Sequence, residues 1–179
     1  MKEYFFGDKR IAVYDDLFPV QYKSEVYQFA ISSLYRIAWA DSSEQEKLRY
    51  RCLNSEYSEF DLENLGFIKE LKKTPAISEM DGYHIEKVVM NLSTPSDINF
   101  IHTHAQSKVL LYYVNLSWED GWFGETLFYD NTKKDIVFSS AYTPGRLIAF
   151  DASIPHTIRP QSILAQFYRF SLAIVLDLN

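Results

Sequence analysis

Apolar side chains in the N-terminal part of the chain recur at helical spacing. Val26 lies four residues after Tyr22, and Phe29 and Ala30 lie three and four residues after Val26. They follow the segment Asp15–Pro19, whose acids and proline are typical of a helix start. The pattern predicts a helix over residues 18–33.

Two further elements are expected before residue 83. Residues 61–73 suit a second helix, which ends before Thr74-Pro75 because the residue preceding a proline disfavours the α region. Residues 34–40 are rich in aromatic and apolar side chains and predict a strand. Residues 41–47 are polar and are expected to be exposed.

From Tyr83 onward the pattern changes to short apolar runs separated by turn residues. These runs predict eight strands: residues 84–91, 99–104, 109–115, 125–130, 135–139, 146–150, 156–159 and 167–176. Strands that follow helices indicate an α+β fold whose second part is a barrel or jelly roll. We expect one domain over 1–179, in which helical support (1–82) packs outside a strand core (83–179).

The amino-acid composition excludes several classes of function for this protein. The 179 residues are 47% hydrophobic, which is typical of a globular chain, and the net charge of −6 leaves no basic stripe for nucleic acid. Cys52 is the only cysteine, so an internal disulfide is excluded and a reducing compartment is favoured. No run approaches the roughly 18 apolar residues of a membrane span. We therefore expect a cytoplasmic protein with neither a membrane nor a nucleic-acid partner.

Three of the four histidines fall into two short clusters in the last eighty residues. Neutral imidazole is the commonest protein metal ligand, and residues i and i+2 of a strand point to the same face. His102 and His104 would therefore project together, and His156 would arrive from a distant strand. This spacing predicts a metal site made of His102, His104 and His156. His84 has no such neighbours and is interpreted as a structural or surface residue.

Arg169 lies inside a nearly continuous apolar run, residues 167–176. A buried arginine is rarely tolerated without an anionic partner, and its planar fork suits a carboxylate. Ser171 points the same way and could donate to the same carboxylate. Two partners are open at this point: a carboxylate ligand, or an acid of this chain in a structural ion pair.

These residues together resemble the prolyl-4-hydroxylase-like branch of the iron(II)- and 2-oxoglutarate-dependent dioxygenases. The resemblance covers about residues 83–176 and rests on these pieces in order: His102-Thr103-His104, Leu110-Leu111-Tyr112-Tyr113-Val114-Asn115, Trp118, Trp122, Gly124-Glu125-Thr126, Pro144-Gly145-Arg146-Leu147, Phe150-Asp151, His156 and Arg169-Phe170-Ser171. It implies a double-stranded β-helix that binds iron(II) and 2-oxoglutarate, with ascorbate as a reductant.

The resemblance also implies roles for single residues. Members of the family hold iron through a His-x-Asp pair and a distal histidine, which makes His156 the distal ligand here. Arg169 would bind the far carboxylate of 2-oxoglutarate, and Ser171 matches a serine found two residues after that arginine. Tyr113 matches a tyrosine that hydrogen-bonds the same carboxylate, although core packing is an equally simple interpretation of its position.

The sequence departs from the family at the usual aspartate. His104 occupies that position if the pair begins at His102, and Gln106 occupies it if the pair begins at His104; we favour the first register. Three neutral imidazoles would leave the whole 2+ charge on the metal, attract anions more strongly and suit zinc as well as iron.

Three functional hypotheses follow. The first is a 2-oxoglutarate-dependent oxygenase that hydroxylates an unactivated C–H bond of a small molecule or peptide side chain. The second is a three-histidine dioxygenase of cupin type that uses no 2-oxoglutarate. The third is a non-catalytic binding protein on the same fold. Binding of 2-oxoglutarate to the metal-loaded chain separates the first from the other two.

Overall fold

The computed structural model describes residues 1–39, 46–47, 52–78, 82–95 and 97–179. Its helices are α1 Val20–Ser32, α3 Glu59–Leu62, α4 Gly66–Leu71 and α5 Pro75–Ser78. Its strands are β1 Lys2–Phe6, β2 Lys9–Tyr14, β3 Arg36–Trp39, β4 Cys52–Tyr57, β5 Tyr83–Ser93, β6 Lys108–Tyr113, β7 Thr126–Tyr129, β8 Ile136–Ser140, β9 Leu147–Asp151, β10 His156–Ile158 and β11 Arg169–Leu178.

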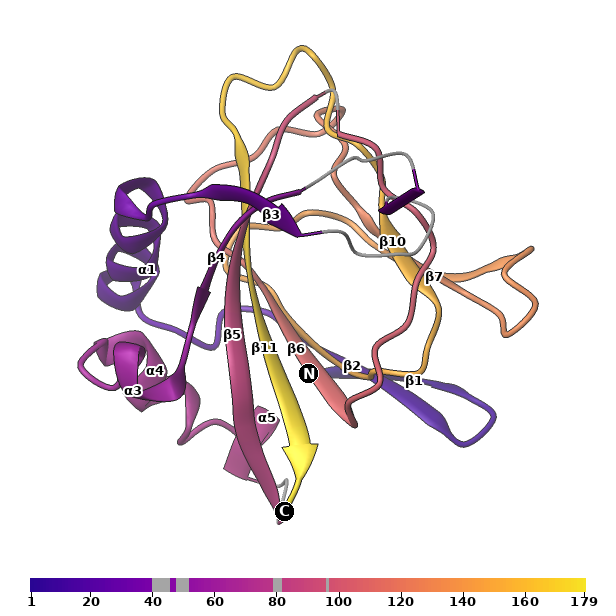
Figure 1. Cartoon of the computed structure of the whole chain (residues 1–179), viewed down its shortest axis with the longest axis horizontal. Helices are drawn as coiled ribbons and strands as arrows, with labels where there is room; N and C mark the ends of the chain where they lie inside the picture. The colour runs from indigo at the N-terminus through magenta and orange to yellow at the C-terminus, as the bar shows by residue number, and fades with distance from the viewer. Residues whose placement is uncertain (40–45, 48–51, 79–81, 96) are drawn as a thin grey trace.

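The described strands form two antiparallel sheets (Figure 1). The large sheet has eight strands in the order β1-β2-β9-β6-β11-β5-β4-β3, and the small sheet has three in the order β10-β7-β8. The α+β class is as expected, but the strands make two separate sheets and no closed barrel. The large sheet extends beyond the predicted core because the N-terminal strands β1 to β4 add to both of its edges.

Side-chain alternation along the central strand β11 divides the interior into two cores. Its even-numbered residues, Phe170 to Leu176, pack toward the helices with Leu110 and Tyr112 of β6. Its odd-numbered residues face the small sheet, where Tyr113 and Phe128 belong to the second core. Both faces of β11 are therefore covered, which explains its nearly continuous apolar sequence.

The helices cover the outer face of the large sheet, as the sequence predicts (Figure 1). The helix expected over 18–33 is confirmed as α1. The helix expected over 61–73 is instead divided into α3 and α4. The carboxylate of Glu25 in α1 explains the division, because it accepts hydrogen bonds from the backbone nitrogens of Gly66 (2.9 Å) and Phe67 (2.7 Å) and so caps a new helix start.

Seven of the eight strands expected after residue 83 are present, as β5 to β11. Residues 99–104 are the exception, because His102 makes only an isolated bridge with His156. The strand expected over 34–40 corresponds to β3, while β1, β2 and β4 were not predicted. Most of the polar segment 41–47 lies outside the described residues.

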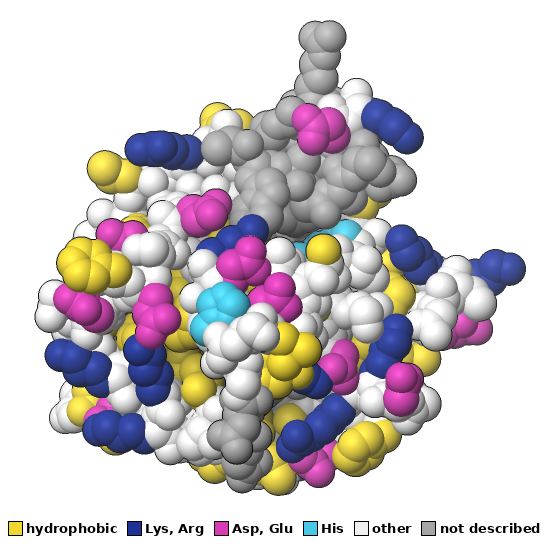
Figure 2. Space-filling model, turned by 60° about the horizontal axis from the view of Figure 1, so that its bottom comes forward, with side chains coloured by type: hydrophobic (Ala, Val, Ile, Leu, Met, Phe, Trp, Pro, Cys, Tyr) yellow, Lys and Arg dark blue, Asp and Glu magenta, His cyan; other side chains and the backbone are white. Residues whose placement is uncertain are grey.

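No helix among the described residues is long and apolar enough to cross a membrane. On the face drawn in Figure 2, basic and acidic side chains are interspersed, so that face carries no continuous basic patch.

Candidate metal centre

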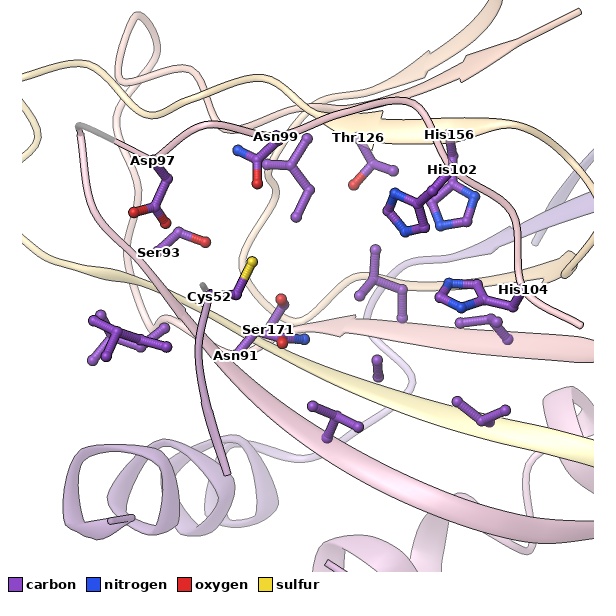
Figure 3. Close-up of a pocket in the computed structure, with 18 of the residues that line it drawn as sticks. Cys52, Asn91, Ser93, Asp97, Asn99, His102, His104, Thr126, His156 and Ser171 are labelled. Atoms are coloured by element: carbon purple, nitrogen blue, oxygen red, sulfur yellow. The ribbon is translucent and has the colours of Figure 1, made fainter. Parts of the chain in front are cut away.

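The structure brings His102, His104 and His156 together at one end of a cavity between the two sheets (Figure 3). One ligand atom from each imidazole lies within 4.8 Å of the others. Backbone pairing explains this convergence. His102 exchanges two hydrogen bonds of 3.0 Å with His156, and the amide of His104 donates to the carbonyl of Ala152 at 3.0 Å. The two histidine segments are thus joined directly, without a regular strand at 99–104.

Hydrogen bonds orient two of the three rings. Nδ1 of His102 lies 3.0 Å from the carbonyl oxygen of Phe100, and Nδ1 of His156 lies 2.9 Å from that of Ile154. A carbonyl oxygen only accepts, so each Nδ1 carries the proton in these bonds. Each Nε2 therefore keeps its lone pair, as a metal ligand requires.

Burial favours the neutral form of two of the three histidines. Burial, followed by the positive charges of His102 and Lys87, lowers the pKa of His104 to about 4. Burial also lowers the pKa of His156 well below its ordinary value, with smaller contributions from His102 and His104. Neutral imidazoles that are close together and desolvated form a donor set suited to a divalent transition metal.

The cavity beside the histidines has a volume of about 80 Å³. Its apolar lining includes Val89, Val109, Leu111, Phe150, Ile158 and Val175. Its polar lining, apart from the histidines, consists of Cys52, Asn91, Ser93, Asp97, Asn99, Thr126 and Ser171. Figure 3 shows Thr126 between Asn99 and the histidines, and Ser171 beside Asn91 on the neighbouring strand.

Arg169 adjoins this lining through Ser171 and is completely buried. Its Nε donates to the carbonyl oxygen of Gly124 at 3.0 Å, and its Nη1 donates to Oγ of Ser171 at 3.2 Å. Its Nη2 is buried and has no hydrogen-bond partner among the described residues. The guanidinium carbon lies 4.7 Å from the ring centre of Tyr142 and 5.4 Å from that of Tyr113.

No acid among the described residues forms a direct salt bridge with Arg169. The negative charge of Asp97, which lines the cavity, acts on the guanidinium without such a contact. The aromatic rings offset part of the desolvation cost by cation–π attraction. Burial lowers the pKa of the guanidinium, although arginine stays charged in proteins. A buried cation with one unused donor is chemically suited to an anionic ligand.

Tyr113 lies on the same side of the large sheet, directly opposite Ser171 in the β6–β11 pairing. Its hydroxyl lies 2.8 Å from Oγ1 of Thr126 and 3.3 Å from the carbonyl oxygen of Ser140. Its ring stacks on Tyr142 at 4.5 Å between ring centres. Both interpretations of Tyr113 thus describe part of its surroundings: it packs in the core, and its hydroxyl reaches a side chain that lines the cavity.

The other residues that the sequence analysis named differ in whether they lie at the cavity. Gln106 is absent from the cavity lining, whereas His104 belongs to the histidine cluster, so the preferred register is the one that brings three imidazoles together. His84 is exposed. Trp118 and Trp122 do not line the cavity; Trp118 packs on Tyr142 and on Trp122.

Sequence reasoning missed the roles of Gly124, Thr126, Asn99 and Tyr142 at the site. Gly124 and Thr126 lie in a stretch that the family resemblance includes, but the resemblance assigned no role to either residue. Asn99 and Tyr142 carry no motif. Their proximity to the cavity or to Arg169 arises only when the two sheets pack against each other.

Solved structures of similar fold cover nearly the whole chain. A prolyl hydroxylase from Trichoplax adhaerens, in complex with a hypoxia inducible factor oxygen degradation domain peptide fragment, has a TM-score of 0.62 at 16% identity and matches over 93% of this chain and 83% of its own. A Pseudomonas putida prolyl-4-hydroxylase has a TM-score of 0.61 at 13% identity, over 94% of this chain and 92% of its own.

A viral collagen prolyl hydroxylase from Paramecium Bursaria Chlorella virus-1 has a TM-score of 0.64 at 13% identity, over 94% of this chain and 90% of its own. No family model and no curated protein matches the sequence. At these identities the likeness establishes the fold. The chain has the double-stranded β-helix fold of the prolyl hydroxylases, which confirms the resemblance seen in the sequence at the level of structure.

Proposed function

We propose that this protein is an iron(II)- and 2-oxoglutarate-dependent oxygenase with a three-histidine metal site. The main support for the proposal is that a histidine cluster and a buried arginine lie at one cavity. Three neutral imidazoles gather at one end, and a buried arginine with an unused Nη2 donor adjoins the lining at Ser171. A molecule that chelates a metal and ends in a carboxylate would use both.

The residues present could hold both the metal and 2-oxoglutarate. His102, His104 and His156 would hold the metal, since hydrogen bonds to backbone carbonyls leave Nε2 of His102 and of His156 free. Arg169 would bind the distal carboxylate through Nη2, with Ser171 beside it. Iron(II) and 2-oxoglutarate, when bound, supply oxidative decarboxylation coupled to hydroxylation of a C–H bond.

The protein's own contribution is to orient the reactants and to exclude water. The packed rings of Tyr113 and Tyr142 fix the arginine before any ligand arrives, so little side-chain entropy is lost on binding. The apolar walls of the cavity, such as Leu111 and Phe150, provide a low-dielectric surrounding in which the guanidinium attracts a carboxylate strongly. The three neutral ligands leave the metal's full 2+ charge to attract the same anion.

The primary substrate belongs to one of two classes, a small molecule or a side chain of a peptide. The Trichoplax relative binds a peptide fragment, which favours the peptide class for this chain. The polar part of the lining, including Asn91 and Asn99, would supply hydrogen bonds to such a substrate.

The decisive experiment is anaerobic titration of the iron(II)-loaded protein with 2-oxoglutarate, followed by visible absorption. We expect a metal-to-ligand charge-transfer band in the wild type, a much weaker band in Arg169→Ala, and loss of metal in His104→Ala. His84→Ala is the matched control, because it removes a histidine outside the cluster. Iron-dependent formation of succinate in air would complete the test. A wild type that holds iron but gives neither band nor succinate contradicts the proposal.

One observation favours a second candidate, the cupin-type dioxygenase without 2-oxoglutarate. The cluster of potential ligands among the described residues contains three histidines and no carboxylate. Calorimetry separates the candidates: metal-loaded protein that releases no heat with 2-oxoglutarate supports the cupin type. Absence of both metal and 2-oxoglutarate binding would leave a non-catalytic binding protein.

A further inference from the structure

We propose that Gly124 is a positioning residue that aims the Arg169 guanidinium at the co-substrate carboxylate. The inference rests on the proposed function, since it concerns the residue that would bind 2-oxoglutarate. It goes further by assigning a role in co-substrate affinity to a backbone segment that contains no acid or base in contact with the cavity. This segment, residues 122–125, precedes strand β7.

Gly124 lies so close to the arginine that a side chain at this position would crowd it. Its carbonyl oxygen accepts the Nε hydrogen bond of Arg169 at 3.0 Å. A Cβ atom at this position would lie 3.1 Å from Cδ and 3.3 Å from Nε of the same arginine. Its φ of +87° also favours glycine. Any larger residue must therefore displace the Arg169 side chain or the segment itself.

Several contacts hold the 122–125 segment in place, so displacement of the segment is resisted. The amide of Ser162 donates to the carbonyl oxygen of Trp122 at 2.8 Å. Nε1 of Trp118 donates to the carbonyl oxygen of Phe123 at 2.9 Å. The amide of Arg159 donates to the carbonyl oxygen of Glu125 at 2.9 Å.

Phe123 is itself held in an unusual conformation, which marks the segment as constrained. It has a φ of +60°, a left-handed value that is uncommon for a residue other than glycine. The guanidinium of Arg159 lies 3.5 Å from its ring centre, and Arg159 also pairs with Glu125 at 3.4 Å. Local strain of this kind persists only where the surrounding contacts enforce it.

The consequence is a guanidinium with a single free direction. Gly124 occupies the Nε edge, Ser171 occupies Nη1, and the Tyr142 ring covers one face. Nη2 alone remains without a partner among the described residues. Because a charge-assisted contact with a carboxylate depends on the direction in which Nη2 points, a shift of a few tenths of an ångström at Gly124 is transmitted to the ligand.

The chain offers a matched control for the test. Gly121 has nearly the same φ, +86°, but a Cβ atom there would meet nothing within 4 Å. Gly121→Ala and Gly124→Ala therefore introduce the same methyl group and similar backbone strain, while Gly124→Ala alone touches Arg169. The measurement is calorimetric binding of the metal and then of 2-oxoglutarate to the full chain without oxygen.

We expect Gly124→Ala to weaken 2-oxoglutarate binding about tenfold or more while metal affinity stays at the wild-type value. Gly121→Ala should leave both affinities unchanged. In an Arg169→Ala background, the added effect of Gly124→Ala should disappear, because the two residues act through one contact. If Gly124→Ala fails to fold, Arg159→Ala, an exposed substitution that releases Phe123, should weaken 2-oxoglutarate binding several-fold with metal binding intact.

Three results would contradict the role of Gly124. Each can be told apart from a result that contradicts the proposed function. Wild-type affinity for 2-oxoglutarate in both Gly124→Ala and Arg159→Ala would contradict it. Equal losses in Gly121→Ala and Gly124→Ala would show general strain and not positioning, and a loss that persists without Arg169 would exclude action through the arginine. A wild type that binds metal but not 2-oxoglutarate would reject the proposed function, and the inference with it.

Discussion

Nη1 of Arg169 donates to Oγ of Ser171 at 3.2 Å, and both side chains are completely buried on the same face of strand β11. The pair places a fixed cation next to a hydroxyl that lines the cavity beside the histidine cluster. An ordinary buried arginine would be paired with an acid of its own chain. Here a serine, a backbone carbonyl and an aromatic ring hold the guanidinium, and Nη2 has no hydrogen-bond partner among the described residues.

Replacement of Ser171 by alanine should weaken 2-oxoglutarate binding about fivefold, the equivalent of about 1 kcal/mol for one hydrogen bond. The substitution leaves Nη1 without its acceptor and lets the guanidinium rotate. Isothermal calorimetry of the metal-loaded protein measures the change. Ser139→Ala, an exposed substitution on β8, is the control. Unchanged affinity in Ser171→Ala would show that Ser171 does not help to hold the arginine.

Zinc should stabilise the protein against heat through the histidine cluster. A metal that binds only the folded state contributes about 2.7 kcal/mol at one hundred times its Kd, which corresponds to a Tm increase of about 5–10 °C for a chain of this size. The increase should vanish in His156→Ala and persist in His84→Ala. An equal increase in all three proteins would place zinc elsewhere.

His104→Asp tests the charge of the metal site. The aspartate would restore the His-x-Asp pattern and lower the charge of the site by one, so we expect weaker attraction for 2-oxoglutarate, by several-fold, with metal still bound. Metal content and calorimetry on the same sample give both quantities. Stronger 2-oxoglutarate binding in the variant would contradict the view that three neutral ligands enhance anion binding.

The Asp15–Arg146 ion pair should make stability depend on pH in the acidic range. Nε and Nη2 of Arg146 donate to the two carboxylate oxygens at 2.7 and 3.1 Å, and the hydrogen bond from Arg146 lowers the pKa of Asp15 in the folded state. A lowered folded-state pKa adds stability above the unfolded value, and this stability is lost as the pH falls through the folded value.

We therefore expect Asp15→Asn to reduce the free energy of unfolding by about 0.5 kcal/mol at neutral pH, since the pair is partly exposed. The difference from wild type should shrink below about pH 4. Urea unfolding at several pH values measures it. Asp16→Asn is the control, because Asp16 is far more exposed and makes a single contact with Lys23. A pH-independent difference would assign the loss to packing.

Glu25→Ala should destabilise the fold by about 1–2 kcal/mol, because the backbone nitrogens of Gly66 and Phe67 lose the carboxylate that caps α4. Glu25→Gln should fall between wild type and Glu25→Ala, since one acceptor remains. Thermal unfolding gives the order of the three proteins, with Gln28→Ala on the exposed face of α1 as control. Equal stability of Glu25→Ala and wild type would show that α4 needs no cap from α1.

The local pattern of apolar and polar residues was sufficient to predict those helices and strands whose apolar residues repeat over a short stretch of chain. Helix α1 and the strands after residue 83 follow from side-chain spacing, because a helix or strand that buries one face must repeat apolar residues with its own period. The division of the predicted helix 61–73 could not be predicted from that spacing. It depends on Glu25, some forty residues earlier, which reaches the new helix start only after α1 packs on α4.

For the candidate site, too, some features follow from the sequence and others only from the tertiary structure. The sequence by itself pointed to the candidate ligands His102, His104 and His156 and to the unusual arginine in an apolar strand, because these residue types are rare and costly in such positions. Tertiary structure decided that the three imidazoles meet, through the pairing of His102 with His156, and that Nη2 of Arg169 has no hydrogen-bond partner among the described residues. It also decided that Gly124 presses on the arginine. These relationships join segments far apart in the chain, and only the packing of the two sheets brings their atoms within contact distance.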